Sequence, residues 1–161
     1  ETSRASDLMP RFKISTILPE GVRSLPWLFG AYAPDIYYSL YSIEEGFRKR
    51  WMPRAMHYSQ GLDILEDWQH HSHKIPRIHL ALIEGENDSI PQLTELAETV
   101  TGRIRADFNI VRYNPPDYRT HEGDVGRAYN ILRHYGPTQV VDRVGFDVFA
   151  SCGMFVSGDL T

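Results

Sequence analysis

Short apolar runs alternate with longer amphipathic stretches along the chain, the order typical of helices packed over a parallel sheet. Four runs rich in β-branched and aromatic residues predict strands, at residues 12–18, 36–42, 77–83 and 106–113. An apolar piece at 139–143 resembles a further strand, and an apolar stretch at 146–156 surrounds the cysteine. The fold class is therefore α/β with a mostly parallel sheet.

Helices are predicted between these strands, at residues 59–71, 91–101 and 124–135, each with apolar side chains on one face. Their expected buried stripes are Leu62, Leu65 and Trp68; Leu93, Leu96, Ala97 and Val100; and Val125, Ala128, Tyr129 and Leu132. Ser59 is the expected N-cap of the first, Pro91 lies in the first turn of the second and Gly102 ends it. A weaker helical stretch at 22–32 contains Pro26 and Gly30.

Polar residues follow the predicted strands, where right-handed crossovers gather the loops on one face. The positions to examine are Ser15 and Thr16, Ser39 to Tyr41, Glu84 to Asp88, and Asn114. Serines in strands also satisfy backbone groups, and Asn-Pro is a common turn, so each residue alone has an ordinary structural explanation.

Length and composition predict one domain over residues 1–161, in which residues 1–10 form a flexible tail. The chain is long enough to form a hydrophobic core. The net charge is −4, from 17 Lys and Arg against 21 Asp and Glu. No apolar run approaches the ~20 residues of a membrane helix, which with the polar start predicts a cytoplasmic protein. Glu1 is not an initiator methionine, so we expect a processed product or part of a longer chain.

The single cysteine, Cys152, excludes an internal disulfide and any site that needs several thiolates from this chain. We expect no metal site here: His70, His71 and His73 form a solvated helix end, and His79 lies inside a strand as a packed histidine. Arg48, Arg50 and Arg54, interleaved with Trp51, suit RNA phosphates and bases, although a solvated helix face explains them equally well.

Six short motifs, in order, resemble the radical S-adenosylmethionine (SAM) adenine methyltransferases of the RlmN/Cfr type, which modify ribosomal and transfer RNA. Ser-Leu-Tyr at 39–41 stands where the family has Ser-Leu-His. Asn114 lies in a Tyr-Asn-Pro motif where the family has Trp-Asn-Pro, and Cys152 lies in Ala-Ser-Cys-Gly where the family has Ala-Ala-Cys-Gly. The others are Ile14-Ser15-Thr16, Phe47-Arg48 followed by Pro53, and Glu86-Asn87-Asp88.

This resemblance implies the C-terminal four βα units of a partial (β/α)6 radical SAM barrel. SAM would contact Ser15, Ser39, Leu40, Tyr41 and Asn114 at the strand ends, and Cys152 would be the methyl-carrying cysteine. In the family, one SAM methylates this cysteine and a second is cleaved to a radical that activates the methyl group, which then adds to an adenine carbon of RNA.

The departures from the family are equally informative. The Cys-x-x-x-Cys-x-x-Cys motif that holds the family's [4Fe-4S] cluster is absent, as are the Gly-Glu-Pro segment and a second, resolving cysteine. The cluster is therefore expected only in a longer parent chain or a partner, and this chain alone is expected to be inactive.

Two functions remain open: the C-terminal portion of a radical SAM RNA methyltransferase, or a noncatalytic module that binds SAM, a nucleotide or a protein through the same strand ends. The partial barrel also leaves residues 12–18 as an open sheet edge with unpaired backbone groups, which predicts self-association through that edge.

Overall fold

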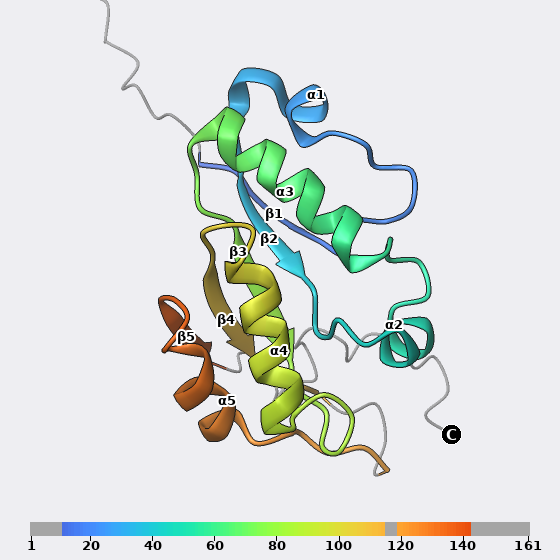
Figure 1. Cartoon of the computed structure of the whole chain (residues 1–161). Helices are drawn as coiled ribbons and strands as arrows, with labels where there is room; N and C mark the ends of the chain where they lie inside the picture. The colour runs from blue at the N-terminus through green and yellow to red at the C-terminus, as the bar shows by residue number, and fades with distance from the viewer. Residues whose placement is uncertain (1–10, 115–118, 143–161) are drawn as a thin grey trace, which may run out of the picture.

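The computed structural model describes residues 11–114 and 119–142. Strands and helices alternate along the chain, as the apolar pattern predicts (Figure 1). The strands are β1 (Lys13–Thr16), β2 (Asp35–Ser39), β3 (Arg77–Ala81), β4 (Asp107–Val111) and β5 (Thr138–Val141). The helices are α1 (Leu25–Phe29), the 3-10 turn η1 (Gly30–Tyr32), α2 (Glu45–Trp51), α3 (Tyr58–Ser72), α4 (Ile90–Thr101) and α5 (Val125–Leu132).

The strands form one sheet in the order β1-β2-β3-β4-β5, and all four pairings are parallel. The predicted α/β class is confirmed, and the strand-like piece expected near residue 140 is β5. Because all four pairings are parallel, the carboxyl ends of the five strands lie on the same side of the sheet. Within the described residues β1 pairs only with β2, so it is the predicted open edge.

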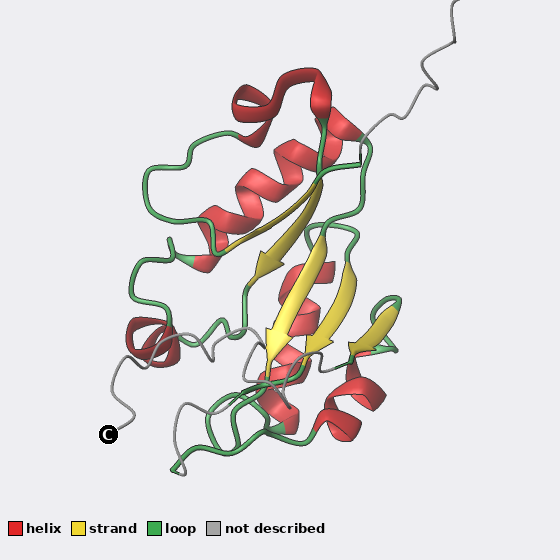
Figure 2. Ribbon diagram, turned by 180° about the vertical axis from the view of Figure 1, so that it is seen from behind, coloured by secondary structure: helices red, strands yellow, loops and turns green. Residues whose placement is uncertain are grey.

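Helices α3 and α4 lie across one face of this sheet (Figure 1). In the view from behind, the strands lie in front of these two helices (Figure 2). Side chains alternate between the two faces along each strand. Tyr38, Ile78 and Phe108 are in register on the covered face and are fully buried. This face contains most of the hydrophobic core, to which Leu62, Leu65 and Trp68 of α3 contribute.

The predicted helical stripes are confirmed for α3 and α4, whose expected apolar residues are all buried. In α5 only Ala128 and Leu132 are buried, while Tyr129 is 36% exposed, which corrects its expected core position. The helix is short and contacts α4 on one side only, so its outer flank stays in solvent.

Helix ends are fixed by side chains that accept the unpaired first-turn amides. Ser89 and Gln92 form a capping box at α4, with Pro91 in the first turn as predicted, and Asp124 caps α5. The expected cap of α3, Ser59, is wrong by two positions. His57 takes that place, and its Nδ1 accepts a hydrogen bond from the Ser59 backbone N–H at 3.3 Å.

No helix in the described ranges is both long and apolar enough to span a membrane.

Candidate functional site

The residues predicted to contact SAM lie at the carboxyl ends of the strands or just beyond them. Ser15 is exposed in β1, Ser39 is the last residue of β2, and Asn114 follows β4 and is half-buried. The fold thus brings these residues to one side of the sheet, with β3 between β2 and β4. We call this side, with the loops that follow the strands, the strand-end rim.

Leu40 and Tyr41 form the turn by which the chain leaves β2. The Leu40 side chain is fully buried in the core, and its backbone N–H and carbonyl oxygen form hydrogen bonds with His79 and Arg48, so Leu40 shapes the rim through its backbone. Tyr41 is half-buried and adopts a φ of 59°. That left-handed conformation is uncommon for a residue with a side chain and is kept only where neighbouring contacts impose it.

The sheet face without described helices carries a connected polar cluster, which we call the polar face. The Arg77 Nη1 donates a hydrogen bond to the Tyr37 hydroxyl at 2.7 Å, and the guanidinium lies over the Tyr37 ring, 5.2 Å from its centroid. On its other side Arg77 forms an ion pair with Asp107 at 3.6 Å. These residues occupy the same register level on β2, β3 and β4.

One level nearer the rim, Ser39, His79 and Asn109 stand side by side on the same three strands. The Asn109 Nδ2 lies 3.2 Å from the His79 Nε2, and the His79 ring meets the edge of Tyr37 with centroids 4.9 Å apart. The Asn109 Oδ1 is buried and has no hydrogen-bond partner among the described residues. A buried acceptor without a partner is costly, so this level has unused hydrogen-bonding capacity beside the rim.

Burial lowers the pKa of His79, and the positive charge of Arg77 adds to this effect. At neutral pH the ring is therefore uncharged, and its Nε2 can accept the hydrogen bond from Asn109. His79 was predicted to be a packed or hydrogen-bonded histidine. It is half-buried and satisfied by Asn109, but it stands on the polar face and not in the helix-covered core.

His79 and Asn109 were missed as candidate site residues. Their signal was present in the sequence, because Arg77 and His79 in one strand and Asp107 and Asn109 in the next are polar residues spaced by two. Such spacing puts them on one face of a sheet.

Arg48 is a correction to the predicted basic patch. Its side chain is 5% exposed, and its guanidinium donates to the carbonyl oxygens of Leu40 (2.9 Å), Ser42 (3.2 Å) and Met56 (2.7 Å). It is therefore committed to the protein interior and cannot reach an RNA backbone. Arg50 is 58% exposed and forms an ion pair with Glu86, and Arg54 is exposed.

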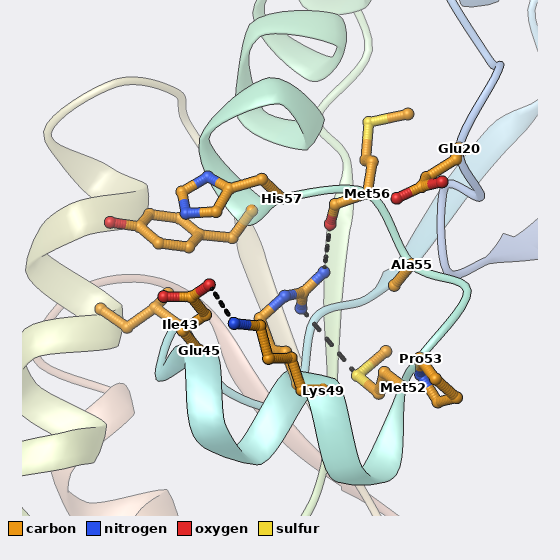
Figure 3. A pocket seen from close by; sticks show the side chains of 11 residues that line it. Glu20, Ile43, Glu45, Lys49, Met52, Pro53, Ala55, Met56 and His57 are labelled. Carbon is orange, nitrogen blue, oxygen red and sulfur yellow. Dashed lines mark hydrogen bonds and ion pairs between the residues drawn. The ribbon is translucent and has the colours of Figure 1, made fainter.

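A pocket of about 190 Å³ opens beside α2, and Arg48 is one of its lining residues (Figure 3). Met52 and Met56 line it, and an ion pair between Lys49 and Glu45 (2.7 Å) stands at its side. Pockets for ligands of cofactor size span about 300–1,000 Å³. This one is too small for SAM and is separate from the rim residues predicted to bind it.

Cys152 lies outside the described residues. Within residues 11–114 and 119–142, no three His, Cys, Asp or Glu side chains converge to hold a metal ion. A [4Fe-4S] cluster needs several cysteine ligands, and the full sequence contains one. The residues of this chain therefore do not fit such a cluster.

Comparison with known proteins confirms the resemblance read from the sequence. The chain is similar to the probable dual-specificity RNA methyltransferase RlmN of Clostridium botulinum, in strains Hall and Langeland among others, with 29% identity over 123 residues. The match covers 71% of this chain and 35% of the relative, so the chain spans about a third of the relative's length. No protein-family model matches the chain.

Two solved structures share the fold. A radical SAM methyltransferase from Sphaerobacter thermophilus superposes with a TM-score of 0.72 at 22% identity, over 88% of this chain and 43% of that one. A domain of pyruvate-formate lyase-activating enzyme from Bacteroides vulgatus gives a TM-score of 0.54 at 15% identity, over 66% of each chain. The sheet and its helices thus have the same fold as a part of each of these two chains.

Proposed function

We propose that this chain is the SAM-binding C-terminal portion of an enzyme that methylates an adenine carbon in RNA. The chain is similar to a segment of about a third of the length of an RlmN-type radical SAM methyltransferase. One observation carries the proposal: Ser15, Ser39, the Leu40–Tyr41 turn and Asn114 lie along one side of the sheet, at the carboxyl ends of its strands. These are the positions at which the family resemblance expects SAM.

The residues present fit SAM chemically. SAM carries hydroxyl, amino, carboxylate and heterocyclic groups, which pair with the side chains of Ser15, Ser39 and Asn114, while the Leu40–Tyr41 turn shapes the rim beside them. The unpaired Oδ1 of Asn109 supports a polar ligand near this end of the sheet. When bound, SAM would supply the methyl group, while the chain's own residues hold and orient it.

Cys152 is proposed as the methyl-carrying residue, since a thiolate is the nucleophile that accepts a methyl group from a sulfonium. The Cys152 thiolate would supply the electron pair of the new S–C bond, and the electrons of the broken sulfonium bond would stay with SAM, which would depart as a neutral thioether. This step needs no cluster. The later chemistry needs cluster ligands that the chain lacks, so we propose that the chain is inactive without a cluster-bearing part.

RNA is the proposed substrate because the similar Clostridium proteins are named as RNA methyltransferases. Arg50 and Arg54, the exposed members of the basic patch, would contribute phosphate contacts, and the net charge of −4 keeps nonspecific binding weak. An RNA substrate also implies a cytoplasmic reaction.

Calorimetric titration of the chain with SAM tests the proposal. Ser39→Ala and Asn114→Ala are each expected to weaken binding about tenfold, the effect of one lost hydrogen bond to a polar ligand. Ser72→Ala, at the last residue of α3, and Asn130→Ala, at an exposed position of α5, make the same chemical changes outside the rim and should leave the affinity unchanged.

Binding that both rim substitutions weaken supports a SAM half-site. If SAM binds and neither rim substitution matters, the ligand lies elsewhere and the residue assignment is wrong. If SAM does not bind at all while an adenine nucleotide or a protein does, the alternative of a noncatalytic module replaces the proposal.

The cluster-bearing part is proposed to join at the β1 edge. Beside this edge the structure exposes large apolar side chains: Phe12 (50%), Trp27 (84%), Leu28 (47%) and Tyr32 (80%). Phe12 and Tyr32 meet edge to face, with centroids 6.4 Å apart. One flank of α1 packs on α3, so the exposed flank of α1 and the β1 edge have the geometry to receive one further strand and helix.

In the isolated chain we expect this same surface to drive self-association. Light scattering over a range of concentrations should show a mass above that of the monomer, and Trp27→Glu should lower it toward the monomer by placing a charge on the exposed aromatic surface. A strictly monomeric mass at every concentration would contradict the expectation.

A further inference from the structure

The turn that leaves β2, residues 40–42, is held by two side chains that come from elsewhere in the sequence. Arg48 reaches it from α2, and Asn87 reaches it from the loop after β3. Both side chains are buried, at 5% and 2% exposure. The turn contains Leu40 and Tyr41, so any part that these two side chains play in ligand binding rests on the proposed function of that turn in binding SAM.

Arg48 holds the turn from the side of α2. Its Nη1 donates to the carbonyl oxygens of Leu40 and Ser42, the residues on either side of Tyr41, while its Nη2 donates to Met56. No carboxylate within the described residues pairs with this guanidinium. A buried cation without a carboxylate partner is expensive, and a purely structural role could be filled by an apolar side chain of similar size.

Asn87 holds the turn from the side of β3. Its Nδ2 donates to the Tyr41 carbonyl oxygen at 2.9 Å and to the Ala81 carbonyl oxygen at 3.0 Å. Its Oδ1 accepts from the Ile83 backbone N–H at 2.8 Å. One carboxamide thus ties the turn after β2 to the turn after β3, across the rim.

The two side chains together occupy the carbonyl oxygens of three successive residues, Leu40, Tyr41 and Ser42. With those carbonyls fixed, the peptide planes of the turn are fixed too, including the left-handed conformation of Tyr41. A turn defined this fully presents its remaining groups in one arrangement, so a ligand does not have to order it on binding.

We infer that Arg48 and Asn87 are positioning residues that hold the Leu40–Tyr41–Ser42 turn in its ligand-binding geometry. Neither side chain reaches the ligand itself. The charge of Arg48 and its basic neighbours predicted contact with RNA. In this inference Arg48 instead acts on the SAM half-site, through the backbone of the turn.

Two conservative variants test the inference. Arg48→Lys keeps the charge but loses the planar fork that reaches two carbonyls at once. Asn87→Asp keeps the shape and the acceptor for Ile83 but loses both donated hydrogen bonds. Arg133→Lys makes the same chemical change as the first variant at an exposed position on the far side of the molecule and is the matched control.

Two readouts separate positioning from general stability. Calorimetry with SAM should show affinity weakened about tenfold or more in both variants and unchanged in the control. Amide hydrogen exchange followed by NMR should speed up at Tyr41 and Ser42, while the core amides of Ile78 and Leu80 stay protected as in the unsubstituted chain.

The inference is overturned if exchange at the turn rises no more than exchange in the core, because Arg48 and Asn87 then only stabilise the fold. It is also overturned if the turn loosens and SAM affinity is unchanged. Should the unsubstituted chain fail to bind SAM, the proposed function fails. Faster exchange confined to the turn would still show that the two residues hold it.

Discussion

The two faces of the sheet are built from the same strands and differ in nearly every physical respect. On the covered face Ile78 and Leu80 are fully buried against helices. On the polar face their neighbours Arg77 and His79 are half-buried and joined in a network with Tyr37 and Asn109. A strand that shifted its register by two residues would keep the same side chains on each face. A shift of one residue would exchange the two faces.

This comparison separates what stabilises the fold from what is available for chemistry. The covered face gains its free energy from apolar area removed from water, and it needs no particular polar geometry. The polar face keeps ionic and hydrogen-bonding groups in fixed positions next to the rim, at a cost in desolvation. Substitutions on the two faces should therefore differ in kind as well as in size.

The largest expected effect is on the covered face. Leu80→Ala leaves a cavity at a fully buried position in the central strand and should lower the free energy of unfolding by about 2–5 kcal/mol. Gln139→Ala, at an exposed position in β5 on the polar face, should change it by less than about 0.5 kcal/mol. Urea unfolding measures both, and similar effects from the two substitutions would remove the distinction between the faces.

A smaller effect is expected from pH on the polar face. The pKa of His79 is lowered by burial in the folded chain, whereas an unfolded histidine titrates near about 6.5. Below that pH the unfolded chain binds a proton that the folded chain resists, so the free energy of unfolding falls until the pH passes the folded pKa. Above the unfolded pKa the His79 ring is neutral in both the folded and the unfolded chain, so it contributes no pH dependence.

Urea unfolding of the unsubstituted chain and of His79→Gln, between about pH 7.5 and about pH 5, checks this expectation. The variant removes the titrating ring, so its stability should fall less steeply with decreasing pH. His134→Gln, at an exposed histidine, is the control and should keep the original slope. Equal slopes for all three proteins would mean that His79 is not held neutral.

The layout of the fold could be predicted from the sequence because it follows from local patterns. Apolar runs and helical stripes are properties of neighbouring residues, and they gave the strands, α3, α4 and the parallel sheet. The rim followed from the same reasoning, since parallel strands share their carboxyl ends. The cap of α3 was misplaced because histidine is an uncommon N-cap, whereas the serine two residues later belongs to a favoured type.

The contacts inside the site could not be predicted in this way. Arg48 lies between charged residues on a short helix, and nothing local shows that its guanidinium turns inward to carbonyls at residues 40, 42 and 56. The link from Asn87 to Tyr41 spans 46 positions. Such contacts depend on how elements pack, so they appear only once the strands and loops are placed together.

The most direct measurement of the central claim is NMR mapping of SAM binding on the isotopically labelled chain. We predict amide shifts concentrated along the rim, at Ser39 to Ser42, Ile83 to Asn87 and Asn114, together with His79 on the polar face. The chemical shifts of the amides in α3 and α4 should not change. Shifts confined to the pocket beside α2, or no shifts at all, would contradict a SAM half-site at the strand ends.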